Sequence, residues 1–486
     1  MKKTNKLYKD YKFYLLVIYV VAAVIFVAQT FISKLLPLKY IAGITILLLL
    51  LGLAFYFLLF SRRVNKINRA LGVFLTVVLS ISMIVGNFYL YTTYSALGNM
   101  STNEDKKVGV SIVVLKDSSY KKIDDLLGKT FGKATNLPDK NVDKTQETLM
   151  STYNSDMEVT EYDNIGAFAD ALYNNEVDAI ILNEASRGLF DEKHPEFDDE
   201  TRVIKTYTYT EESTNIAKPV DVTNDPFVMY VSGIDTYGSL QTVSRTDVNM
   251  LLAVNPNTHQ ILIVSIPRDY YVPQTCQGNA KDKLTHTGIF GVDCSVSSLE
   301  QFFDLDINYY GRINFSSVVE IVDALGGVEI NSPVAFTTLH GGYNIQQGLQ
   351  HMDGSTALGF VRERYGLSGG DNDRVKNQAR LISAIVDKIT SPAVLTNYMG
   401  LMSSVGDAIQ LNMTTDEISS LVHMQIDTMS KWEISQFSLS GKGETNWSPA
   451  NGFNSYVMIP DTTSVEQAKT YIMKVLSGEK VQVNEL

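Results

Sequence analysis

The stretch "RTDVNMLLAVNPNTHQILIVSIPRDYY", Arg245–Tyr271, holds two apolar runs separated by the polar turn "NPNTHQ". Each run is rich in Val, Ile and Leu and has the length of a strand, so the stretch predicts two neighbouring strands. Charged residues stand at their ends: Arg245 and Asp247 open the first run, and Arg268 and Asp269 follow the second. Ligands of open α/β sheets bind outside the carboxyl ends of strands. We therefore expect Arg268 and Asp269 to border a binding site.

The segments on either side continue this pattern. Upstream, "PFVMYVSGID" (226–235) is a β-rich run that ends at Asp235. Downstream, "NFSSVVEIVDALGG" (314–327) has the spacing of an amphipathic helix that Ser316 or Asn314 can cap, and "VEI" then resumes a strand. Strand–helix–strand order predicts an α/β/α sandwich.

A cluster of arginines lies in "VRERYGLSGGDNDRVKNQAR" (361–380). Its members are Arg362, Arg364, Arg374 and Arg380. If Asp373 caps a helix that begins at Arg374, then Arg374 and Gln378 fall within its apolar face. An inward arginine is costly unless an anion meets it, and a helix N-terminus adds N–H groups that favour an anion. The segment therefore predicts an anion site.

Two of these arginines, Arg362 and Arg364, share one face if the backbone is extended. The guanidinium fork suits phosphate oxygens better than the point charge of lysine does. A second interpretation stays open, in which the arginines form internal salt bridges with nearby aspartates. Asp235 and Asp247 are hard oxygen ligands, and Mg²⁺ commonly binds through one or two carboxylates plus substrate phosphates. Arginines together with Mg²⁺ indicate a pyrophosphate site.

The first hundred residues contain three long apolar runs, at about Phe13–Ile32, Tyr40–Phe60 and Ala70–Tyr94. Each is long enough to cross a hydrocarbon layer of about 30 Å. Lysines and arginines cluster before the first run and between the second and third, so the N-terminus is expected inside the cell. Three spans then place the remainder of the chain outside, in a multi-pass protein of the cell membrane.

The net charge indicates which partners are excluded, and the two cysteines agree with an extracellular location. The net charge of −12 argues against a nucleic-acid partner, because domains that bind nucleic acid usually carry a basic surface. Cys276 and Cys294 are the two cysteines, and in an oxidising compartment they are expected to form a disulfide. Two unpaired thiols are the alternative.

Between the membrane runs and the first strand quoted above, the chain alternates strand and helix patterns. "VGVSIVVL" (108–115) predicts a strand and "SYKKIDDLLG" (119–128) predicts a helix closed by Gly128. No charged or Gly-rich constellation there indicates a ligand. The expected organisation is a membrane anchor over residues 1–97, an extracellular α/β accessory domain over 98–218, and a catalytic domain over 219–486.

Several ordered motifs resemble a known family. "SGID", "RTDVNMLLAVNP", "ILIVSIPRDYYV", "VDALGGVEI", "DGSTALGFVRER" and "DNDRVKNQ" occur in the order seen in the LytR–CpsA–Psr family. The resemblance covers about 226–390, with a weaker continuation to the C-terminus. The membrane anchor followed by an accessory domain is similar to the CpsA-type members of streptococcal capsule loci.

The resemblance implies a Mg²⁺-dependent phosphotransferase that moves a glycopolymer, here capsular polysaccharide, from a polyprenyl-pyrophosphate lipid to peptidoglycan. It implies metal binding by Asp235 and Asp247. The pyrophosphate-binding residues that it implies are Arg268, Arg362, Arg364, Arg374 and Gln378, with Arg245 in the matching "RTD". One departure is the loop "KLTHTGIFG" (283–291), where the family often reads Lys-Ile-Asn, so the resemblance assigns no role to Lys283 or His286.

In the expected reaction, a hydroxyl of peptidoglycan attacks the phosphorus nearer the polymer, and polyprenyl phosphate leaves. Arg268 and Arg374 are the expected catalytic arginines, and Asp371 is the candidate general base, with helix capping by Asp371 or Asp373 as the alternative. A non-catalytic extracellular sensor of capsule assembly that binds polyprenyl phosphates is the other functional hypothesis. "GLSGG" (366–370) matches a hydrolase elbow, but its charged flanks favour a loop and not a nucleophilic Ser368.

Overall fold

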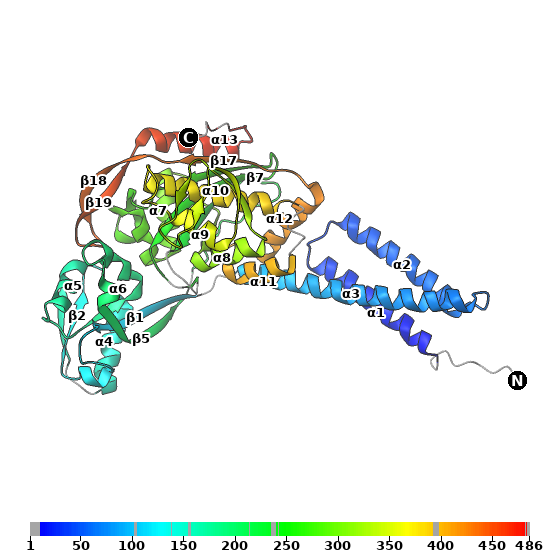
Figure 1. The fold of residues 1–486 in the computed structure, drawn as a ribbon, viewed down its shortest axis with the longest axis horizontal. Coiled ribbons are helices and arrows are strands. Elements are labelled where there is room, and N and C mark those ends of the chain that lie inside the picture. The colour runs from blue at the N-terminus through cyan, green and yellow to red at the C-terminus, as the bar shows by residue number, and fades with distance from the viewer. Residues whose placement is uncertain are drawn as a thin grey trace.

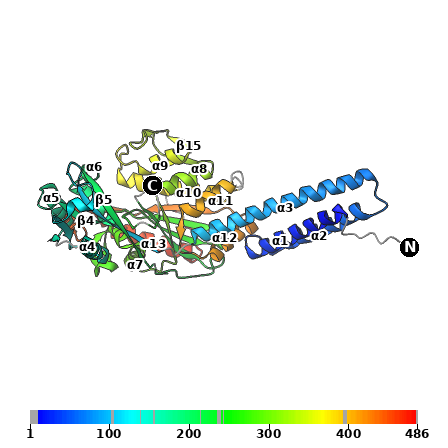
Figure 2. The same ribbon diagram turned by 90° about the horizontal axis from the view of Figure 1, so that it is seen from below.

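The computed structural model describes residues 10–101, 105–137, 139–153, 157–212, 214–234, 240–241, 243–391, 398–481 and 483. Three long helices come first: α1 (Tyr11–Ile32), α2 (Leu38–Phe60) and α3 (Lys66–Met100). All three are long and apolar enough to cross a membrane, which confirms the predicted runs. Figures 1 and 2 show them projecting together from one end of the molecule, and α3 is longer at both ends than predicted.

Residues 106–211 form a five-stranded sheet, the accessory sheet, with strand order β3-β2-β4-β1-β5. Its strands are β1 (Lys106–Leu115), β2 (Thr130–Ala134), β3 (Glu158–Tyr162), β4 (Ala179–Asn183) and β5 (Thr201–Glu211). The helical elements are η2 (Ile123–Leu126), α4 (Lys140–Tyr153), α5 (Ile165–Tyr173), η3 (Glu184–Glu192) and α6 (Phe197–Glu200). Figure 1 places this sheet at the end of the molecule opposite the membrane helices.

The helix predicted over 119–128 is wrong, because only the short 3₁₀ turn η2 forms there. The carboxylate of Asp125 accepts hydrogen bonds from the backbone N–H groups of Lys121 and Lys122. Such local side-chain bonds offer the backbone an alternative to a helix.

A second, six-stranded sheet, the main sheet, has strand order β16-β11-β6-β7-β8-β17. Its strands are β6 (Phe227–Ile234), β7 (Thr246–Asn255), β8 (Gln260–Ser265), β11 (Tyr309–Ile313), β16 (Gln410–Leu411) and β17 (Glu433–Ser438). β6 pairs in parallel with β11, whereas β7 runs antiparallel to both β6 and β8. The ends of β6, β11 and β8 and the start of β7 therefore meet at one edge.

Helices cover both faces of the main sheet. Successive residues of each strand point to opposite faces and therefore into two separate apolar clusters. Along β7, Met250 and Leu252 belong to one buried cluster, and Leu251 and Ala253 belong to the other. The first cluster packs against α8 (Phe315–Ala324), α9 (Gly354–Arg362), α10 (Asp371–Ile389), α11 (Tyr398–Ala408) and α12 (Thr415–Thr428). The second packs against α7 (Val292–Phe303) and α13 (Thr462–Leu476). The predicted α/β/α sandwich is confirmed.

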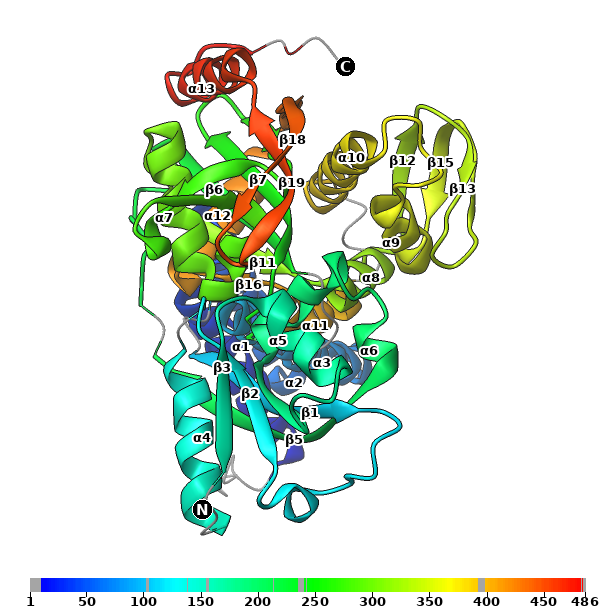
Figure 3. The same ribbon diagram turned by 90° about the vertical axis from the view of Figure 1, so that its left-hand side faces the viewer.

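Shorter elements complete the fold and surround the main sheet (Figure 3). The remaining strands are β9 (Tyr271–Gln274), β10 (Ala280–Lys283), β12 (Val328–Ser332), β13 (Phe336–Thr337), β14 (Asn344–Ile345), β15 (Gly348–Met352), β18 (Gly441–Ser448) and β19 (Phe453–Pro460). Two 3₁₀ turns, η4 (Thr275–Gln277) and η5 (Leu284–Phe290), lie between them. Asn314 caps α8, since its Oδ1 accepts from Ser317 N at 2.9 Å, which settles the choice between Asn314 and Ser316.

Two local predictions for the arginine segment are wrong. α10 begins at Asp371 and follows Gly370, so Asp373 lies inside the first turn, where it accepts a hydrogen bond from Gly369 N. Gly370 has a φ of 57°, a left-handed conformation that glycine adopts without strain and that lets the helix start earlier. Arg362 is the last residue of α9, so Arg362 and Arg364 do not lie on an extended strand.

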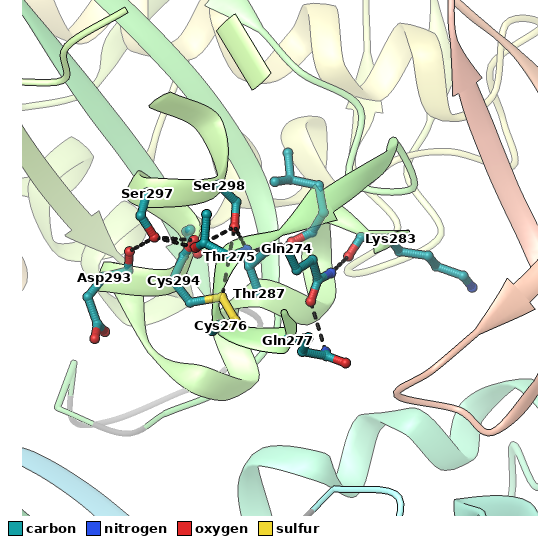
Figure 4. Close-up of a disulfide and its surroundings, with 12 residues drawn as sticks. Gln274, Thr275, Cys276, Gln277, Lys283, Thr287, Asp293, Cys294, Ser297 and Ser298 are labelled. Atoms are coloured by element: carbon teal, nitrogen blue, oxygen red, sulfur yellow. Dashed lines mark hydrogen bonds between the residues drawn. A yellow bond between two sulfur atoms is a disulfide. The ribbon is translucent and has the colours of Figure 1, made fainter. Parts of the chain in front are cut away.

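Cys276 and Cys294 form a disulfide, as predicted, with their Cα atoms 5.5 Å apart. Figure 4 shows that the bond joins η4 to α7, beside a set of hydrogen-bonded hydroxyls. In the same region Gln274 Nε2 donates to the carbonyl of Lys283 at 2.8 Å. The disulfide therefore supports the hairpin that ends at Lys283.

Candidate functional site

A cavity of about 250 Å³ opens at the edge of the main sheet where β6 and β11 end and β7 begins. It is lined by five arginines, and we name it the arginine pocket. They are Arg245, Arg268, Arg362, Arg364 and Arg374. Gln378, one turn after Arg374 on α10, also lines it. The structure thus brings together, around one cavity, all of the residues predicted to bind pyrophosphate, from Arg245 to Gln378.

The remaining wall of the arginine pocket is largely apolar. Side chains from the main sheet and from α8 and α9 form it: Ile234, Val248, Ile313, Phe315, Val318, Leu358 and Val361. A cavity lined by both guanidinium groups and apolar side chains suits a ligand with an anionic head and a hydrocarbon tail. Its volume is at the small end of ligand pockets, so it can hold the head and the first part of such a tail.

Asp247 lies among the arginines at the start of β7. Its Oδ2 accepts a hydrogen bond from Arg268 Nη1 at 2.9 Å, and its Oδ1 is 3.3 Å from Thr285 Oγ1. Burial alone would raise the pKa of Asp247, but the charges of Arg268, Arg245 and Arg374 outweigh burial and hold that pKa below its usual range. The carboxylate is therefore ionised at neutral pH.

The side chains of Arg374, Arg245 and Arg268 are 10%, 17% and 20% exposed. Burial lowers the pKa of Arg374, the carboxylate of Asp371 opposes this effect, and the neighbouring Arg268 lowers the pKa further. Arg374 Nη2 lies 2.7 Å from Asp371 Oδ1, although this ion pair lacks hydrogen-bond geometry. Within the described part of the chain, the buried Nε atoms of Arg268 and Arg374 have no hydrogen-bond partner. Arg268 Nε lies 3.7 Å from Asp269 Oδ2, beyond hydrogen-bond distance. Two largely buried guanidiniums thus each keep one N–H group without a hydrogen bond.

Arg362 and Arg364 each lie over an aromatic ring. Arg362 Cζ lies 4.1 Å from the centroid of Phe315, and Arg364 Cζ lies 4.6 Å from that of Tyr365. Stacking fixes the plane of a guanidinium while its N–H edge can still donate. Gln378 Nε2 is 3.5 Å from the carbonyl of Val361, at the limit of a hydrogen bond.

Two acidic residues of the pocket were not identified from the sequence. Glu363 follows Arg362 and accepts backbone N–H groups of Arg364 and Gly366 at 3.0 and 2.7 Å. Asp191 comes from η3 of the accessory sheet and pairs with Arg245 at 2.7 Å. Glu363 accepts hydrogen bonds from backbone N–H groups, which leave no side-chain pattern in the sequence. Asp191 lies 54 positions before Arg245, so no local pattern links the two.

The predicted metal ligands are only partly placed. Asp235 lies outside the described residues. Asp247 presents its carboxylate to the arginine pocket, and no group of three or more His, Cys, Asp or Glu side chains with metal-site geometry occurs among the described residues. A single ionised carboxylate fits Mg²⁺ only if substrate phosphates and waters supply the other ligands of the ion.

The "GLSGG" segment lies in the turns between α9 and α10. A helix precedes it, whereas a hydrolase elbow follows a strand. The segment is therefore the loop that was predicted.

Comparisons with known proteins identify the family of this chain. The model of the LytR_cpsA_psr family matches residues 197–474, which is more than half of the chain. A second model, described as DNA polymerase processivity factor, matches residues 68–182 and covers less than half. The 197–474 match includes β5 of the accessory sheet, so it begins before the predicted boundary at residue 219.

Curated relatives carry a transferase name. "Polyisoprenyl-teichoic acid--peptidoglycan teichoic acid transferase TagU" of Oceanobacillus iheyensis is 33% identical over 223 residues, covering 44% of this chain and 67% of the relative. The protein of the same name from Enterococcus faecalis is 32% identical over 243 residues, covering 49% and 78%. The crystal structure of B. subtilis TagU is 27% identical, with a TM-score of 0.41, and covers 54% of this chain and all of that one. The protein is a member of the LytR_cpsA_psr family.

Proposed function

We propose that this protein transfers a glycopolymer from a polyprenyl-pyrophosphate lipid to peptidoglycan on the outer face of the cell membrane, and that the polymer is capsular polysaccharide. The observation that carries the proposal is the pair of buried guanidiniums, Arg268 and Arg374, with unsatisfied Nε donors beside an apolar wall. Family membership supports a transferase, because curated members of similar sequence are named as teichoic acid transferases acting on peptidoglycan.

The two walls of the arginine pocket correspond to the two parts of such a lipid. The pyrophosphate meets the arginine forks, which match its oxygens in pairs. The isoprenoid chain lies along the wall that contains Ile313, Val318 and Leu358. Because the cavity is only about 250 Å³, most of the chain extends out of it.

Transfer proceeds by attack of a peptidoglycan hydroxyl on the phosphorus nearer the polymer. A new P–O bond forms to the acceptor, the bond to the bridging oxygen breaks, and polyprenyl phosphate leaves. Arg268 and Arg374 stabilise the charge on the transferring phosphoryl group, which is the main contribution a protein makes to this chemistry. Asp371, held by its ion pair with Arg374, is the proposed acceptor of the hydroxyl proton, which it then releases to water.

Asp247 would hold Mg²⁺ together with Asp235 and the substrate phosphates. When bound, the ion neutralises charge on the phosphates. Asp247 already orients Arg268 through their 2.9 Å hydrogen bond, so this residue positions an arginine whether or not a cation is present.

The outer face is proposed from the distribution of lysines and arginines around the three apolar helices. The disulfide between Cys276 and Cys294 is the form expected in an oxidising compartment. Both observations support an arginine pocket on the outer face, where lipid-linked polymer and peptidoglycan would meet.

The proposal is tested by polymer attachment in cells that express Arg268→Ala or Arg374→Ala in place of the wild-type protein. Peptidoglycan is isolated and digested, and covalently attached capsular polymer is quantified. We expect attachment to fall with either variant and to remain with Lys140→Ala, a control in the accessory sheet. If both arginine variants retain attachment, the protein is not the transferase. If purified wild-type protein binds polyprenyl phosphate but never transfers polymer, a sensor is the better description.

A further inference from the structure

The accessory sheet reaches into the arginine pocket through the end of η3. Asp191 lines this pocket, and its Oδ2 lies 2.7 Å from Arg245 Nη2. The guanidinium of Arg245 passes directly over Gly188, where a Cβ atom would lie 2.5 Å from Arg245 Cζ. Any side chain at position 188 would therefore push Arg245 aside. The side chain of Arg245, just before β7, thus lies directly against the backbone of η3.

Other contacts hold η3 in place independently of Asp191. Glu192 forms an ion pair with Lys283, whose side chain is buried. Leu189 and Phe190 of η3 share an apolar cluster with Val243, which lies two residues before Arg245. Removing the charge of Asp191 should therefore leave η3 packed in its place beside Val243 and Lys283.

Three Arg–Asp pairs of the site have contacts of 2.7–2.9 Å, and they differ in solvent exposure. The side chain of Asp247 is 12% exposed and that of Asp371 is 23% exposed, whereas Asp191 is 59% exposed. Exposed ion pairs contribute little because water screens them and readily solvates the separated charges. Arg245 is therefore the arginine whose carboxylate partner is most readily exchanged. A phosphate offers it more charge and a bidentate arrangement.

We propose that Asp191 is a displaceable counter-ion of the anion site, which neutralises Arg245 until a phosphate group of the donor lipid takes its place. The accessory sheet thereby sets the affinity of the arginine pocket for phosphate. This inference rests on the proposed function. It makes Asp191 a residue that tunes substrate binding and not a catalytic residue, because its carboxylate leaves Arg245 when the donor binds.

The test measures binding of inorganic pyrophosphate to the purified full-length protein in detergent by isothermal titration calorimetry. Asp191→Asn removes the competing charge, so we expect the Kd to fall by about 2- to 5-fold, the range of an exposed charge pair. Asp198→Asn is the matched control: it makes the same change in the accessory sheet, at a carboxylate that pairs with Arg187. We expect no change in the Kd of that variant.

A double variant separates competition at Arg245 from a general effect of charge. In the Arg245→Ala background, Asp191→Asn should no longer tighten binding. The inference is overturned if Asp191→Asn leaves the Kd unchanged or weakens binding, or if its effect persists without Arg245. Arg374→Ala reports on the proposed function separately, since it should weaken pyrophosphate binding at least tenfold. If the wild-type protein does not bind pyrophosphate, or Arg374→Ala binds it equally well, the anion site itself is wrong.

Discussion

Two of the cavities among the described residues, one in the accessory sheet and the arginine pocket, differ in charge balance. The cavity of the accessory sheet, about 380 Å³, is lined by two lysines and two acids, Lys106, Lys140, Asp139 and Glu211. Among the described residues, the arginine pocket is lined by five arginines and by three acids, Asp191, Asp247 and Glu363. The first set is electrically balanced, whereas the second carries an excess of positive charge.

The two cavities also differ in how their charged groups are paired. In the accessory cavity, Lys140 pairs with Glu211 at 3.1 Å and Lys106 pairs with Asp293 at 2.5 Å. In the arginine pocket, buried Nε donors of Arg268 and Arg374 lack partners among the described residues. A buried donor without a hydrogen bond is costly, so the two cavities differ in the pairing of their charged groups and not only in volume.

The largest effect should come from Arg374→Ala. The substitution removes a buried guanidinium from the proposed transferring phosphoryl group, and loss of one such electrostatic donor typically lowers kcat by about 10²- to 10³-fold. Arg374→Lys should recover little of this, because a lysine lacks the planar fork. Polymer transfer from lipid to peptidoglycan by purified protein is the measurement. Lys140→Ala, in the accessory cavity, should retain full transfer; equal losses in the two variants would erase the distinction between the cavities.

Chelation of divalent cations should have the next largest effect. If Mg²⁺ binds through Asp247 and the substrate phosphates, EDTA should lower transfer by about tenfold or more, and added Mg²⁺ should restore it. Asp247→Asn should lose most of the Mg²⁺ stimulation and also disturb Arg268. Mg²⁺ titration of the transfer rate in both proteins checks this. A wild-type rate that EDTA does not change would contradict a metal at Asp247.

A smaller effect is expected from Phe315→Leu, which removes the ring beneath Arg362. Cation–π stacking at a partly exposed site contributes about 0.5–1 kcal/mol, so the KM for the lipid donor should rise by about two- to fivefold. Tyr207→Leu is the matched control, since it removes a ring that Lys205 approaches at 4.6 Å in the accessory sheet. A KM that is unchanged in Phe315→Leu would show that Arg362 does not depend on its ring.

The smallest expected effect is a change in the thermal stability of the protein in acid. Because the pKa of folded Asp247 is lowered mainly by the arginine charges, which outweigh its burial, its stabilising contribution is complete above the unfolded pKa of about 3.9. That contribution is lost as the pH falls through the folded pKa. The difference in Tm between wild type and Asp247→Asn should therefore be constant between about pH 6 and 8 and shrink below about pH 4. Thermal unfolding followed by circular dichroism measures it, and a difference that grows in acid would contradict the sign.

Local sequence determined the elements and several inward-facing residues. Apolar runs of sufficient length produced the membrane helices, and strand-length runs flanking "NPNTHQ" produced β7 and β8. Arg374 and Gln378 are buried on α10 as the helical spacing predicted. These features depend on the chemistry of neighbouring residues, which is why periodicity reveals them.

Tertiary structure decided which groups meet. Asp191 reaches Arg245 across 54 residues, and no local pattern encodes such a contact. The conformation of Gly370, which starts α10 at Asp371, also departed from the capping pattern. The sequence supplied the arginines and aspartates but left open whether they neutralise each other. Packing answered that question in part: it paired three arginines with carboxylates, yet left the Nε atoms of Arg268 and Arg374 without a hydrogen bond among the described residues.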